Sequence, residues 1–79
     1  MATNDRSNLD MTSFAIGLAR RAYTKMGSMP GGPERDELIN LTEPTFTAAM
    51  MHLRNLSADF ADHEVESINK LAEALGEDA

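Results

Sequence analysis

The stretch of residues 32–60, GPERDELINLTEPTFTAAMMHLRNLSADF, decides how the rest of the chain folds. When residues 38–60 are placed on a helical wheel at about 100° per residue, many of their apolar side chains gather within an arc of about 120°. These side chains are Leu38, Ile39, Phe46, Ala49, Met50, Leu53, Leu56 and Phe60. A stripe of this width predicts an amphipathic helix that buries one face.

Pro44 lies inside this stretch. A proline within a helix removes one backbone hydrogen bond and crowds the preceding turn, at a cost of about 3 kcal/mol. Thr42 is a residue type that caps new helices, which favours a break. The apolar stripe nevertheless keeps its phase across Pro44, which points to the opposite side. We therefore predict one long helix over residues 33–60, kinked near Pro44, or two helices that are nearly coaxial.

Two further helices are predicted on either side of this one. An apolar arc of about 200° predicts a helix over residues 9–26 that contacts two neighbours. A stripe that includes Val65, Ile68 and Leu71 predicts a helix over residues 63–75, which Gly76 ends. The chain has few β-branched residues and no alternating apolar pattern. The fold class is therefore all-α, a small helical hairpin or three-helix domain over residues 1–79.

The short length of the chain predicts self-association. A chain of 79 residues buries only a little over ~60% of its unfolded surface, so its core alone is marginal. The chain contains no cysteine, so disulfides and thiolate metal sites are excluded. An apolar stripe on a long helix favours a homo-oligomer. The residues predicted to form its core or interface are Phe14, Leu18, Phe46, Met50, Leu53, Leu56, Phe60, Ile68 and Leu75.

The net charge of −6 is divided unevenly. Up to Arg35 there are five basic and three acidic residues, and from Asp36 onward there are two basic and ten acidic residues. The two parts carry +2 and −8, so they should attract each other. There is no extended basic face for duplex nucleic acid. The longest apolar run near the N-terminus, residues 14–19, is too short to cross a membrane, so we expect a cytoplasmic protein.

The connection between the first two predicted helices is a candidate anion site. Glycines followed by a helix start present backbone amides to an anion. The residues predicted to contact such a ligand are Arg20, Arg21, Tyr23, Lys25 and Arg35. The alternative is a plain connector whose basic residues pair with the acidic part of the chain. Glu34 and Asp36, which lie beside Arg35, favour that alternative.

The histidines do not predict a metal site. His63 has Asp59 and Glu66 at helical spacing, but a helix break between residues 60 and 62 separates Asp59 from it. His52 is roughly 16 Å away along a continuous helix, and two exposed histidines are expected by chance among many acids. No serine has a histidine in a recognisable relationship. We expect no metal, no cofactor and no enzymatic activity.

A few scattered residues of this chain are similar to those of one family of small proteins. Tyr23, the run Pro33-Glu34-Arg35 and the run Lys70-Leu71 are similar to small phage helical-hairpin proteins that sequester cyclic-oligonucleotide signals of anti-phage defence. The histidine and prolines that follow the tyrosine in that family are absent here. The resemblance implies an oligomer that holds its ligand between subunits, with Tyr23 and Lys25 in contact with it.

Three functions follow from these patterns. The first is a small acidic interaction module, an adaptor or inhibitor and one of phage origin if the resemblance holds, that acts as a homo-oligomer and binds another protein. The second is an oligomeric protein that sequesters an anionic nucleotide at the loop of residues 23–35. The third is an acidic mimic of nucleic acid, which rests on the charge of −8 alone.

Overall fold

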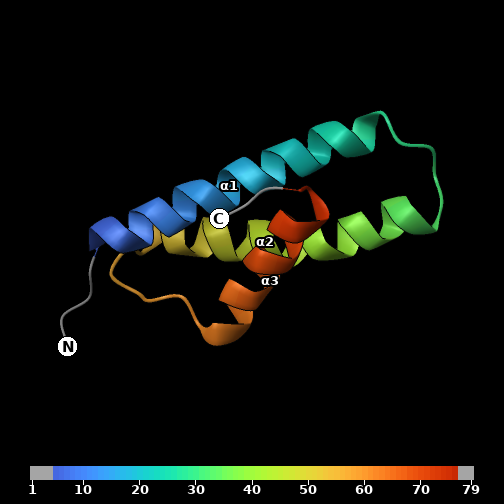
Figure 1. The fold of residues 1–79 in the computed structure, drawn as a ribbon. Coiled ribbons are helices and arrows are strands. Elements are labelled where there is room, and N and C mark those ends of the chain that lie inside the picture. Colours follow the sequence, from blue (N-terminus) through green and yellow to red (C-terminus); the bar gives the residue numbers. More distant parts are fainter. Residues whose placement is uncertain (1–4, 77–79) are drawn as a thin grey trace.

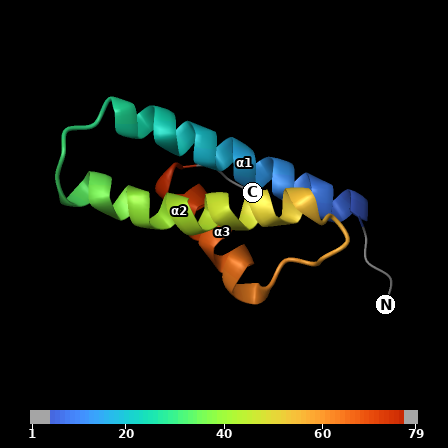
Figure 2. The ribbon, with the colours of Figure 1, turned by 180° about the vertical axis from the view of Figure 1, so that it is seen from behind.

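The computed structural model of the protein describes residues 5–76, and for residues 5 and 6 it describes the backbone alone. Its elements are three helices: α1 (Asp5–Gly27), α2 (Pro33–Arg54) and α3 (Asp62–Ala74). Figures 1 and 2 show that α1 and α2 run antiparallel as a long hairpin and that α3 packs mainly on α2. The molecule is elongated, with extents of 45 × 18 × 18 Å. The predicted all-α fold with three helices is confirmed.

The helix α1 begins four residues before the predicted start because Asn8 is anchored to the loop of residues 55–61. The Asn8 side-chain amide donates to the Leu56 carbonyl at 2.8 Å and to the Asp59 carboxylate at 3.2 Å. The hydroxyl of buried Thr12 donates to the Asn8 carbonyl at 2.7 Å. Both side chains are buried, so their polar atoms are satisfied inside the protein.

Pro44 does not break α2, which is one helix from Pro33 to Arg54. The proline lies on the exposed side, where water can satisfy the backbone carbonyl that loses its partner. Two threonines on the buried side, Thr42 and Thr45, donate to the carbonyls of Leu38 and Leu41 at 2.6 and 3.0 Å. These bonds allow hydroxyl groups to lie in the core of the protein.

The prediction that the second helix reaches residue 60 is wrong, because α2 ends at Arg54. The Asn55 amide turns back to donate to the His52 carbonyl at 3.2 Å, and the Ser57 hydroxyl donates to the Asn55 side chain at 2.7 Å. The loop of residues 55–61 follows. Leu56 and Phe60 therefore lie in this loop, and they do not extend the apolar stripe of α2.

The buried face of α2 also differs from the predicted stripe. It is formed by Leu38, Thr42, Thr45, Ala48, Ala49 and His52. Only Leu38 and Ala49 belong to the stripe read from the sequence. The reason is that α2 contacts both α1 and α3, so its buried face is turned toward the pair of them. Phe46, Met50 and Leu53 remain exposed as a consequence.

The core lies between the three helices. Leu18 of α1 and Ile68 and Leu71 of α3 are fully buried. Small residues line the contact of α1 with its neighbours, because Ala15, Ala19 and Ala22 have no exposed surface. Phe14, Phe60 and Leu75 are partly buried and pack against this core. Within residues 5–76, no helix has the length and apolar character needed to cross a membrane.

Candidate functional site

The exposed large apolar side chains of the described residues are concentrated on the α1–α2 hairpin. They are Leu9, Tyr23, Phe46, Met50, Met51 and Leu53, and their exposed fractions range from 37% to 62%. None of them belongs to α3. Single exposed apolar residues are common in proteins, but six on two neighbouring helices make this part of the surface a candidate for contacts.

Five of these side chains form a single face, which we call the apolar face: Leu9, Tyr23, Phe46, Met50 and Leu53. Phe46, Met50 and Leu53 fall within an arc of about 60° on α2, and Leu9 and Tyr23 within about 40° on α1. The rings of Tyr23 and Phe46 meet edge to face, with centroids 6.0 Å apart. This contact joins the two helices across the apolar face.

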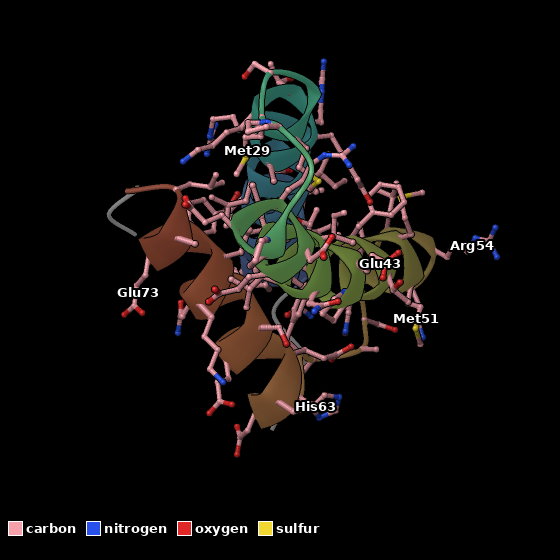
Figure 3. All side chains as sticks on the ribbon, turned by 90° about the vertical axis from the view of Figure 1, so that its right-hand side faces the viewer. Met29, Glu43, Met51, Arg54, His63 and Glu73 are labelled. Atoms are coloured by element: carbon pink, nitrogen blue, oxygen red, sulfur yellow. The ribbon has the colours of Figure 1, made fainter. Side chains whose placement is uncertain are left out.

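The apolar face continues into a shallow hollow on α2. The hollow is lined by Phe46, Thr47, Met50, Met51 and Arg54. Figure 3 views the molecule along the hairpin and shows Glu43 and Arg54 on the side of α2 that is remote from α3. Met51 lies nearer to α3, because it also lines a hollow with His63 and Ser67. Methionine adapts its shape to different partners, so this lining suits a protein surface.

The predicted anion ligands are only partly brought together. Arg20, Arg21 and Lys25 line one open hollow on the outer side of α1, together with Gly17, Thr24 and Ser28. A Cβ atom placed on Gly17 would lie 3.7 Å from a guanidinium nitrogen of Arg21, so that side chain folds back over its own helix. Three basic residues therefore concentrate positive charge around one hollow.

Tyr23 and Arg35 are placed differently from those three residues. Tyr23 belongs to the apolar face, where its ring contacts Phe46. The Arg35 guanidinium donates to the Met26 carbonyl at 3.4 Å, which helps to satisfy the end of α1. The loop that was predicted to gather all five residues therefore separates them.

His52 is buried, which the sequence did not reveal. Its Nδ1 donates to the Ala58 carbonyl at 2.9 Å, since a carbonyl oxygen can only accept. Its Nε2 lies 2.9 Å from the Glu64 carboxylate. The Phe60 ring stacks on the imidazole, with centroids 3.7 Å apart and 15° between the planes. His52 thus fastens the loop of residues 55–61 and the first turn of α3 to α2.

Glu64 completes this arrangement from α3. Its carboxylate also accepts a hydrogen bond from the Ala61 backbone amide at 2.9 Å. Partial burial raises the pKa of Glu64, but the hydrogen bonds from Ala61 and His52 outweigh it, with a further contribution from the charges of His52 and His63. The net pKa of Glu64 is lowered from its usual value. His52 and Glu64 are 12 residues apart on different helices, so no helical spacing in the sequence relates them.

Among residues 5–76, no three histidine or acidic side chains are grouped so that they could hold a metal ion. No protein-family model, no curated protein and no solved structure matches the chain.

Proposed function

We propose that this protein is a helical protein–protein interaction module that works as a homo-oligomer through the apolar face. The observation that carries the proposal is the exposure of Phe46, Met50 and Leu53 on a helix that already buries its adjoining side. Covering a side chain that is about two-fifths exposed gains roughly 1 kcal/mol. Five such side chains on one face supply a sizeable driving force for association.

The proposed role is that of an adaptor or inhibitor that binds another protein. The features that stand out on the described surface are areas for contact: an apolar face on α1 and α2, and methionines around a shallow hollow. An assembled module with net charge −6 per subunit favours basic surfaces on its partner.

The first test is the molar mass of the protein in solution, measured by light scattering and by native mass spectrometry. Wild type is expected to be oligomeric, and Leu53→Asp is expected to dissociate it while the fold is retained, because Leu53 is 46% exposed. Asn69→Asp adds the same charge at an exposed position of α3 and serves as the control. A monomeric wild type, or an unchanged Leu53→Asp oligomer, would count against the proposal.

A second candidate function is the sequestration of an anionic nucleotide in the hollow lined by Arg20, Arg21 and Lys25. The specific support is the presence of three basic side chains around one hollow. ATP would serve as the probe, and thermal stabilisation by ATP should vanish in Lys25→Glu while the unliganded variant melts as wild type does. An equal response of both proteins to ATP would remove this candidate.

A further inference from the structure

Four exposed residues of α2 form a straight seam along the helix. Glu43, Thr47, Met50 and Arg54 follow one another at intervals of four, three and four residues. This spacing is that of a coiled-coil seam, in which side chains of one helix meet those of a second helix. All four are exposed, and the helix is continuous along their whole length. We call these four residues the α2 seam.

The α2 seam carries opposite charges at its two ends and has an open approach. Glu43 is separated from Arg54 by eleven residues, which is about 16 Å along a helix. Within the described part of the chain, neither side chain has an ion-pair partner. Figure 3 shows Glu43 and Arg54 on the side of α2 that is remote from α3. The seam is therefore free to meet another helix.

We propose that two copies of this chain pair along the α2 seam in antiparallel orientation, with a two-fold axis between residues 48 and 49. This pairing rests on the proposed function and specifies its geometry. Each Glu43 then faces Arg54 of the second copy, and each Thr47 faces Met50. A parallel pairing would set Glu43 against Glu43 and Arg54 against Arg54. The order of charges along the seam therefore selects the antiparallel arrangement.

The residues beside the α2 seam add apolar area to the proposed interface, because the four seam residues alone are too few to bury the area that a stable dimer needs. A stable pair of proteins buries about 800 Å² on each partner, roughly 15% of the 5295 Å² surface of this molecule. Phe46 and Leu53 flank the seam on one side, and in the two-fold pair they adjoin the same residues of the second copy. Met51, which at 62% is the most exposed of the large apolar side chains that the structure describes, flanks it on the other side.

The symmetry of this surface favours a second copy over a different protein as its occupant. An isologous contact requires a patch that is complementary to itself after a half-turn. The α2 seam meets this requirement. Glu43 and Arg54 lie at equal distances from the two-fold axis, so a half-turn brings each opposite the other. The same half-turn brings Thr47 opposite Met50. An unrelated partner would not need that relationship.

Charge reversal tests the pairing. Glu43→Arg and Arg54→Glu each place like charges opposite each other at two positions, so the dissociation constant of the dimer should rise about tenfold or more. The double variant restores both pairs with reversed sign and should regain most of the affinity. A mixture of the two single variants should form heterodimers in preference to either homodimer, which native mass spectrometry resolves.

The controls separate this inference from the proposed function. Glu73→Arg reverses an exposed charge on α3 and should leave the dissociation constant unchanged. A dimer that tolerates both single variants as well as it tolerates Glu73→Arg would overturn the seam and leave self-association intact. A monomeric wild type would overturn both. If Arg54→Glu does not fold, Arg54→Gln, which only removes the base, should still weaken the dimer relative to wild type.

Discussion

At the residue scale, His52 connects more parts of the molecule than any side chain predicted to be functional. Its ring receives Phe60 on one face, and its two nitrogens contact the loop carbonyl of Ala58 and the carboxylate of Glu64. These partners belong to the loop of residues 55–61 and to α3. A substitution of His52 should therefore weaken the contact of α3 with α2 and leave the apolar face unchanged.

His52→Ala is expected to lower the free energy of unfolding by about 2–4 kcal/mol, because it removes the imidazole that the Glu64 carboxylate and the Ala58 carbonyl contact and leaves a cavity beside Phe60. Urea denaturation followed by circular dichroism measures the change. His63→Ala removes the exposed histidine of α3 and should stay within about 0.5 kcal/mol of wild type. Similar losses in both variants would contradict the anchoring role of His52.

The lowered pKa of Glu64 predicts an acid-sensitive contribution to stability. Its pKa in the folded protein lies below its usual value of 4.5, so the unfolded chain binds a proton first as the pH falls. The stabilisation is fully present above pH 4.5 and is lost as the pH falls through the folded pKa. The stability gap between wild type and Glu64→Gln should then narrow from pH ~6 to pH ~3. Glu73→Gln makes the same change at an exposed position of α3 and serves as the control.

At the element scale, α2 shows which features of a helix apolar periodicity predicts correctly and which it does not. The apolar stripe predicted the helix correctly. Of the two predicted alternatives, one continuous helix through Pro44 is the one that the structure shows. It misplaced the buried face, because Thr42, Thr45 and His52 are polar types whose burial depends on partners in three dimensions. The end of the helix at Arg54 depends likewise on Asn8 and His52, which hold the following loop.

Pro44 leads to a prediction for the same helix. Pro44→Ala restores a backbone amide to the exposed side of α2, which gains about 3 kcal/mol of helix stability. The more flexible unfolded chain offsets about 1 kcal/mol of this gain. The net expectation is a rise of about 2 kcal/mol in the free energy of unfolding, measured by denaturant titration. Unchanged or lower stability would show that the proline ring makes a necessary contact.

At the scale of the whole molecule, charged side chains within the acidic part of the chain also pair with one another. The ion pair of His52 with Glu64 and that of Lys70 with Glu66 each lie within the acidic part of the chain. The predicted anion ligands are divided between an open hollow, the apolar face and the end of α1. Sequence proximity placed them near one loop, whereas the direction of each side chain on its helix separates them.

The proposed self-association predicts that thermal stability depends on protein concentration. For a dimer that dissociates as it unfolds, each tenfold increase in concentration adds about 1.4 kcal/mol per dimer. The melting temperature of wild type should therefore rise steadily from about 1 to 100 µM, when followed by circular dichroism. Leu53→Asp should melt at one temperature throughout this range. A concentration-independent wild type would argue against coupled association.

The elongated shape of the molecule gives the antiparallel pairing a signature in X-ray scattering. The subunit is 45 Å long. A two-fold axis between residues 48 and 49 lies beyond the middle of α2, so the two copies are offset by about 15 Å along their length. The resulting dimer has a maximum dimension of about 60 Å, whereas two copies joined end to end would reach about 90 Å. A single scattering curve thus distinguishes lateral pairing from head-to-tail association. Head-to-tail contacts that do not close into a ring would lead to filaments.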